Sequence, residues 1–143
     1  MGDDLAASNV NRTYSLAAMS IAIFTFMLIF LYPRFASGEV NAVLFQATLL
    51  VMGVATFSLV FASFHYYGSS LGGRMDDGER AQLAVRGDRF WLLGFTLLFL
   101  APSMVLFSIG LLFVASVWFV LWLIYVLFAV RTFPRVQAGP QRG

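Results

Sequence analysis

The chain has 143 residues, of which 60% are hydrophobic and only 11% charged, and its formal net charge is +2. An ordinary soluble domain carries about 25% charged residues, and a chain this short cannot bury so much apolar surface in a core of its own. The composition therefore indicates a membrane protein. The absence of cysteine excludes disulfides, thiolate metal ligands and thiol nucleophiles, and the small, dispersed net charge does not favour a nucleic acid partner.

Two uncharged stretches in the first half of the chain are long enough to cross a bilayer. A hydrocarbon core of about 30 Å requires about 20 apolar residues in a helix. The first stretch covers residues 14–32 and ends at Pro33, and the second covers residues 41–64. We predict a transmembrane helix over each of them.

The uncharged stretch 90–130 is too long for one membrane helix, because at about 1.5 Å per residue it would extend for about 60 Å. It must therefore turn back on itself. The turn could lie around Pro102 or at Ser108–Gly110, where the glycine can adopt the positive φ of a helix C-cap. We prefer the second position, which gives spans over 90–108 and 111–130 and leaves the proline inside a helix.

The arginines predict the orientation of these four helices. Basic residues flank membrane helices mainly on the cytoplasmic side. Arg34 alone lies in the first connection, whereas the other eight of the nine arginines precede the first helix, separate the second from the third, or follow the fourth. We expect both termini in the cytoplasm, in a bacterial cytoplasmic membrane. The predicted fold class is an all-α integral membrane protein, with residues 1–143 forming one antiparallel four-transmembrane-helix bundle of two hairpins.

Residues 68–88 form the one sizeable polar connection that we predict, on the cytoplasmic side. A short helix could begin near Asp77 and continue into the third span despite Gly87. The acidic run 76–79 lacks the alternating ligand spacing of a calcium loop, so we predict no metal site. Four arginines here could contact anionic lipid headgroups, although topology alone accounts for them: Arg74, Arg80, Arg86 and Arg89.

The single histidine, His65, lies 25 residues after Val40, at the predicted cytoplasmic boundary. Tyr66 and Tyr67 beside it are typical of the aromatic belt at a membrane interface. We expect the imidazole to keep its polar edge in water, and a place at a pore mouth or subunit contact is the alternative. One histidine cannot form a bis-histidine haem site within one chain, and no cysteine or clustered carboxylate is present to complete a metal site, so we predict no cofactor.

A stripe of weakly polar residues marks the second predicted helix. Its members are 7, 8 and 7 residues apart, so at about 100° per residue they stay within about 80° of one another: Asn41, Thr48, Thr56 and Ser63. Small and hydroxylated residues let membrane helices approach closely, and helix packing is therefore the favoured interpretation. The alternative is that the stripe lines a narrow water or ion path in an oligomer.

Two further faces are expected to pack. In the first helix, small residues share one side and would contact the second helix: Ala18, Ala22 and Thr25. In the fourth helix, Trp118, Trp122 and Tyr125 share a face, and large aromatic residues at mid-bilayer favour a protein contact over a cofactor site.

The sequence leaves three functions open, with no catalytic constellation among its residues. The first is a non-enzymatic homo-oligomer that forms a pore or channel. The second is an accessory or structural subunit of a larger membrane complex, and the third is a membrane enzyme subunit that binds haem, quinone or lipid near His65. The expected partners are the lipid bilayer and either further copies of the chain or other membrane subunits.

Overall fold

The computed structural model of the chain describes residues 2–71 and 75–137, with side chains described for 7–71 and 75–131. Four α-helices follow one another: α1 (Gly2–Ala36), α2 (Ala42–Ser70), α3 (Asp77–Ser108) and α4 (Leu112–Gln137). Each contains a stretch long and apolar enough to cross a membrane. The predicted all-helical chain with four candidate membrane spans is confirmed, and membrane localisation follows from the length and composition of the helices.

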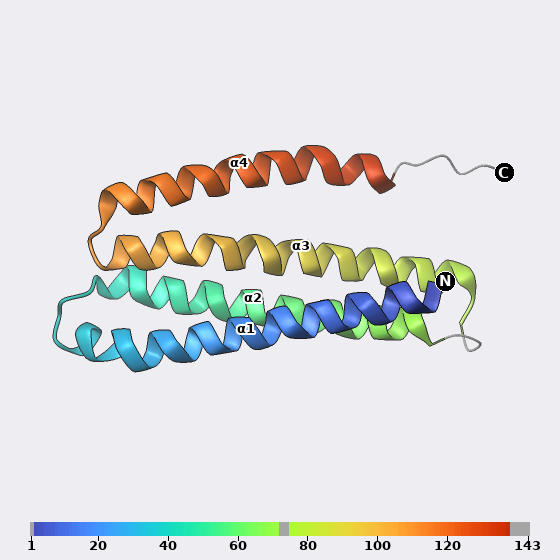
Figure 1. Cartoon of the computed structure of the whole chain (residues 1–143), viewed down its shortest axis with the longest axis horizontal. Helices are drawn as coiled ribbons and strands as arrows, with labels where there is room; N and C mark the ends of the chain where they lie inside the picture. The colour runs from blue at the N-terminus through green and yellow to red at the C-terminus, as the bar shows by residue number, and fades with distance from the viewer. Residues whose placement is uncertain (1, 72–74, 138–143) are drawn as a thin grey trace.

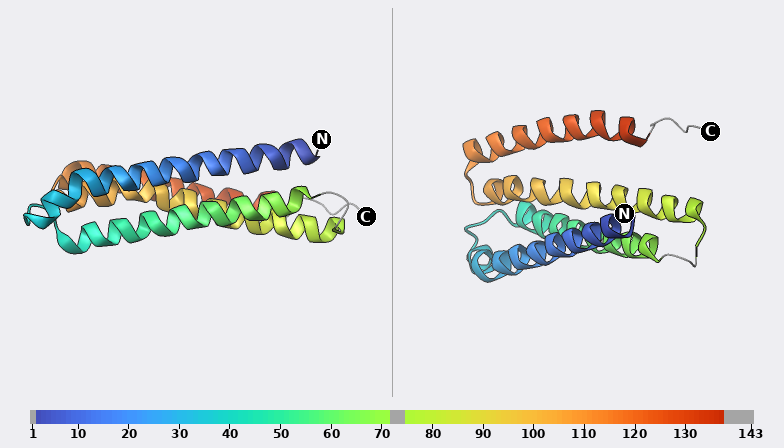
Figure 2. Two further views of the ribbon diagram at one scale, coloured as in Figure 1. Left: turned by 90° about the horizontal axis from the view of Figure 1, so that it is seen from below. Right: turned by 45° about the vertical axis from the view of Figure 1, so that its right-hand side comes forward.

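The helices lie alongside one another in chain order (Figure 1). α2 packs between α1 and α3, whereas α4 packs on the outer side of α3, apart from the other two (Figure 2). Residues 37–41 and 109–111 connect helices at one end of the structure, which we call the turn end. The beginning of α1 and the beginning of α3 lie at the opposite end, which we call the terminal end.

The second residue of each connection at the turn end is a glycine in the left-handed region. Gly110 has φ +81°, its N–H donates to the Phe107 carbonyl at 3.2 Å, and the Leu111 N–H donates to the Leu106 carbonyl at 3.0 Å. This pair of bonds is a Schellman motif, which a residue with a Cβ adopts only with strain. Gly38, with φ +80°, ends α1 in the same way. The last turn therefore lies at the second of the two predicted positions, and Pro102 is inside α3.

The helices extend well beyond the predicted spans, so the polar connection is much shorter than 68–88. α2 continues to Ser70, and α3 begins at Asp77 and passes through Gly87 without a break. The first turn of α3 contains Asp77 and Glu79, whose negative charges stabilise the positive end of the helix dipole. Leaving the hydrocarbon region does not end a helix, because its backbone hydrogen bonds are already made within the helix.

α2 is the centre of the packing, and eight of its ten buried residues form two series that repeat every seven positions. The first series consists of large side chains: Phe45, Met52, Leu59 and Tyr66. The second consists of small side chains: Thr48, Ala55, Ala62 and Ser69. Spacings of three and four residues that sustain a heptad are those of left-handed helix packing. α2 therefore presents a narrow, continuous buried seam along almost its whole length.

α3 presents a complementary row of small buried residues at the same spacing: Gly87, Gly94, Ala101 and Ser108. A Cβ added at Gly94 would lie 2.8 Å from Leu59 Cγ and 2.9 Å from the Ala55 carbonyl oxygen. A Cβ at Gly87 would lie 2.9 Å from the Tyr66 ring. Close approach of two backbones is how membrane helices without a hydrophobic driving force gain packing energy, so these glycines fix the distance between α2 and α3.

Candidate functional site

The predicted stripe on α2 lies mostly inside the bundle. Thr48 and Ser63 have no exposed surface, and Thr56 is half-buried. Asn41 lies outside the helix and is exposed; its side-chain oxygen accepts from the Leu44 N–H at 3.0 Å and so caps α2. The four residues therefore do not act alike, since one is a cap and three lie among neighbouring helices.

The three hydroxyls of the stripe are hydrogen-bonded. Thr48 Oγ1 donates to the Leu44 carbonyl at 2.7 Å, and Ser63 Oγ donates to the Leu59 carbonyl at 3.1 Å. Thr56 Oγ1 donates to its own helix at the Met52 carbonyl, 2.8 Å away. Because that hydroxyl has a single proton, Ser20 Oγ of α1 must be the donor in the 2.7 Å contact between Ser20 and Thr56. Among the described residues, no buried side-chain nitrogen or oxygen lacks a partner.

The residues of α1 that contact α2 differ from those predicted. Thr13, Ala17, Ser20 and Met27 are buried, whereas Ala18, Ala22 and Thr25 are exposed. The expected face was chosen because its residues are small. An alanine can face lipid without an energetic penalty, so small size alone does not identify the buried side of the helix. The Ser20–Thr56 contact is the polar link between α1 and α2.

Near the terminal end, Tyr67 is exposed and His65 is half-buried. His65 Nδ1 is 2.7 Å from the Phe61 carbonyl, and its ring lies 5.2 Å from that of Phe90. Tyr67 is 57% exposed. These positions are compatible with an interfacial location for both side chains.

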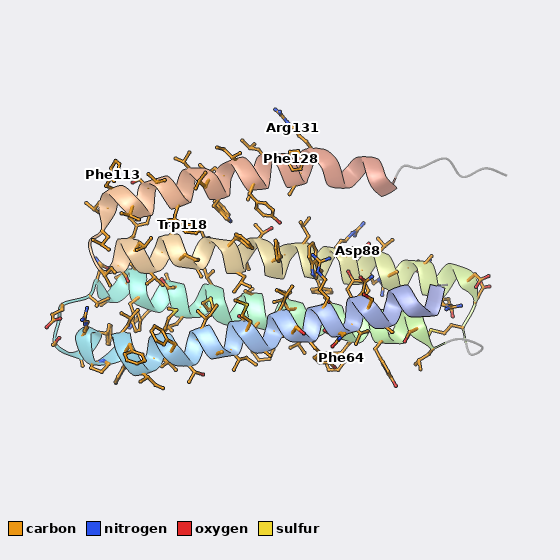
Figure 3. The ribbon with its side chains drawn as sticks, in the orientation of Figure 1. Phe64, Asp88, Phe113, Trp118, Phe128 and Arg131 are labelled. Carbon is orange, nitrogen blue, oxygen red and sulfur yellow. The ribbon has the colours of Figure 1, made fainter. Side chains whose placement is uncertain are left out.

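Tyr66 differs from the expectation that it belongs to a wet aromatic belt, because it is only 5% exposed and packs between α2 and α3. Its ring occupies the space that the missing side chain of Gly87 leaves. Its hydroxyl donates to Asp88 Oδ1 at 2.7 Å, which joins the two helices (Figure 3 labels Asp88). A hydrogen bond to a charged acceptor is among the stronger ones in proteins.

The predicted headgroup arginines lie in different surroundings. Arg80 Nε donates to the Ser69 carbonyl at 3.0 Å, and its guanidinium lies 3.8 Å from Asp77, so this residue holds the end of α2 against α3. Arg86 and Arg89 are exposed and line a shallow surface hollow on α3. Arg74 lies outside the described residues.

A small polar cavity of about 140 Å³ lies at the terminal end between α1, α2 and α3, and the sequence did not point to it. Its lining is mixed in charge: Asn9, Arg12, Thr13, Tyr66, Asp88 and Trp91. The Arg12 guanidinium lies 5.0 Å from the centre of the Trp91 ring, a cation–π distance. The sequence analysis used Arg12 only to predict the membrane orientation. No local sequence pattern relates this arginine to Asp88, which is 76 positions away.

An apolar groove of about 710 Å³ continues along the bundle from that region. It runs between α1 and α3, with Met52 of α2 at its base and Trp118 of α4 at one side. Its lining on α1 extends from Leu16 to Leu31.

Figure 3 shows Trp118 between α4 and α3. The remainder of the predicted aromatic face packs on α3: Trp122 Nε1 donates to the Thr96 carbonyl at 2.9 Å, and the Tyr125 ring lies 5.8 Å from that of Phe99.

Within the described part of the chain, no three histidine, aspartate or glutamate side chains come together as a metal site would require. Comparison with known proteins adds no assignment: no family model, no curated protein and no solved structure matches the chain. The described residues provide three candidate features: a largely buried hydroxyl stripe, a charged cavity at the terminal end and an apolar groove beside it.

Proposed function

We propose that the protein is a non-enzymatic structural subunit of a membrane assembly, in which its four helices form an antiparallel bundle with both termini in the cytoplasm. The antiparallel arrangement is supported by contacts at both ends of α2. The Asn41 N–H donates to the Ser108 carbonyl, whereas Ser69 accepts from Arg80 at the other end. The orientation rests on the arginine distribution, with Arg34 at the turn end and most of the others toward the terminal end.

The observation that carries the choice of a structural role over a pore is the burial of the α2 stripe. Thr48 and Ser63 have no exposed surface, and their hydroxyls are hydrogen-bonded within the helix. A water path along this stripe would require α2 to separate from its neighbours. Packing of hydroxylated residues between helices needs no such movement.

The outer side of α4 is the surface best suited to association with other membrane chains. Within the described residues, α4 packs against α3 and leaves large side chains exposed, among them Phe113 at 83% and Leu112 at 64% exposure. Figure 3 shows Phe113 and Arg131 pointing away from α3. Aromatic side chains carry much of the energy of protein interfaces.

Two measurements test this proposal. Extraction of the protein in native nanodiscs, followed by mass analysis, should give assemblies larger than one 15.9 kDa chain, with other subunits or further copies. In liposomes, the purified protein should give no ion flux above that of empty vesicles. A single chain in the nanodisc would contradict the structural role, and flux from a closed ring of identical chains would establish the pore instead.

The double variant Thr48→Val with Thr56→Val separates the two roles within the molecule. Valine keeps the volume and removes both hydroxyls. Only that of Thr56 makes a contact between helices, with Ser20 of α1, and such a contact is worth about 0.6 kcal/mol and at most about 2 kcal/mol. A packing stripe predicts a modest loss of stability. A pore predicts that flux falls while the assembly stays intact, because an apolar constriction dewets.

A further inference from the structure

We propose that the charged cavity and the apolar groove together bind one phospholipid whose headgroup contains both a phosphate and a primary ammonium, as in phosphatidylethanolamine. The bilayer leaflet concerned is the one at the terminal end. The proposal concerns a specific lipid site and does not depend on whether the protein is a structural subunit or a pore.

The cavity and the groove are adjacent. Arg12 lines the cavity, and Leu16, one turn further along α1, is the first lining residue of the groove. On α3, Trp91 lines the cavity, and Phe95, one turn further along the helix, lines the groove. The two rings stack with their centres 4.9 Å apart. A molecule with a polar head and an apolar tail can therefore occupy both at once.

The position of the pair along the bundle matches that of a lipid headgroup. Arg12 precedes the first uncharged stretch by two residues, and Asp88 precedes the third by two. The groove extends over the residues from Leu16 to Leu31, about 22 Å at about 1.5 Å per residue. One leaflet supplies about half of the hydrocarbon core of about 30 Å, so the groove can hold the full length of a tail.

The charges of the cavity select the headgroup. The Arg12 guanidinium is exposed and lies over Trp91, with no ion pair to a described carboxylate, and it is free to bind a phosphate. Asp88 uses Oδ1 to accept from Tyr66, which leaves its second oxygen available to a further donor. A purely anionic headgroup would be repelled by Asp88. A headgroup with a phosphate and an ammonium satisfies both residues.

The ammonium must also donate a hydrogen bond, which distinguishes three common lipids. Phosphatidylethanolamine offers N–H donors to Asp88, phosphatidylcholine keeps the positive charge but has no N–H, and phosphatidylglycerol has no positive charge. Delipidated full-length protein in detergent should bind dioleoyl phosphatidylethanolamine about tenfold more tightly than either of the others, measured by native mass spectrometry; tenfold corresponds to about 1.4 kcal/mol.

Paired variants locate the headgroup. Arg12→Gln should weaken phosphatidylethanolamine binding about tenfold (~1.4 kcal/mol), whereas Arg34→Gln, at the other end of the same helix, should leave it unchanged. Asp88→Asn keeps a carbonyl acceptor for Tyr66 but removes the charge, so it should abolish the preference over phosphatidylcholine. Glu39→Gln, at the turn end, is its control.

A second pair locates the tail and does not disturb the charged residues. Ile23 lines the groove, and Ile21 is exposed on α1 outside it. Ile23→Trp should therefore block lipid binding, while Ile21→Trp should not.

The affinities of the unmodified protein for the three lipids test the proposal even if a charge variant does not fold. Equal affinity for the three lipids, or equal effects of the two tryptophan variants, would overturn the proposal. Binding of glycerophosphoethanolamine as tight as that of the whole lipid would overturn the role of the groove.

Discussion

The contact between Gly94 and α2 allows a sharp prediction about the stability of the bundle. In Gly94→Ala the added Cβ would lie 2.9 Å from the Ala55 carbonyl oxygen and 3.1 Å from the Leu59 backbone nitrogen, in addition to 2.8 Å from Leu59 Cγ. Two of these three atoms belong to the backbone and cannot rotate aside, so α2 and α3 must move apart. Overpacking of this kind costs about 1–3 kcal/mol.

A glycine in α2 provides the matched control. Replacing Gly53 with alanine meets no atom within 4 Å, and it gains the same helix propensity, about 1 kcal/mol, as the change at Gly94. The difference between the two variants therefore isolates the clash and should be about 1–3 kcal/mol. The free energy of unfolding is measured by denaturant titration in mixed micelles.

The outcome that refutes this reasoning is equal stability of the two variants, since the close approach of α2 and α3 would then be absent. Gly87→Ala provides an intermediate case. The three atoms nearest to its Cβ all belong to the ring of Tyr66, which can shift by a small rotation, so we expect a loss between those of the other two variants.

Two further predictions rest on single contacts and a third on the distribution of the arginines. The hydroxyl pair of Ser20 and Thr56 should show a coupling of about 0.6 kcal/mol, and at most about 2 kcal/mol, in a double-mutant cycle with Ser20→Ala and Thr56→Val; zero coupling would mean that the pair does not form. Trp122→Phe removes the bond to the Thr96 carbonyl, so α4 should become more sensitive to proteolysis, by about 1 kcal/mol of local stability; unchanged cleavage would contradict the packing of α4 on α3. A cysteine at Ser70, in a chain with no other cysteine, should react with an impermeant reagent only from the cytoplasmic side; labelling from outside would invert the orientation.

The choice of packing residues shows where sequence reasoning reached its limit. Thr48 was identified together with Thr56 and Ser63, but the small residues buried at heptad spacing after Thr48 are Ala55 and Ala62. Of the predicted residues after Thr48, Ser63 is also fully buried, whereas Thr56 is half-buried next to the fully buried Ala55. In a helix that is apolar on every side, the alternation of polar and apolar residues no longer marks the buried face.

The spacing of the glycines in α3 indicates a close helix contact, and the sequence analysis did not use it. Gly87 and Gly94 are seven residues apart, and Ala101 and Ser108 continue the series. Residues seven positions apart lie on one face of a helix, and small residues on one face are typical of close helix contacts in membranes. Gly87 was interpreted instead as an obstacle to the helix, whereas its missing side chain makes room for Tyr66.

The sequence by itself determined that the chain is helical and that four stretches can cross a membrane, and it favoured Gly110 over Pro102 as the position of the last turn. These features depend on local quantities: the length of uncharged stretches, the hydrogen bonding of the backbone in an apolar medium, and the conformational freedom of glycine. Only the tertiary structure decided which faces meet, that Tyr66 is buried against Asp88, and that Arg12 shares a cavity with that carboxylate. Such contacts join residues far apart in the chain, and lipid-facing and protein-facing side chains are equally apolar, so no local pattern distinguishes the pairs that form.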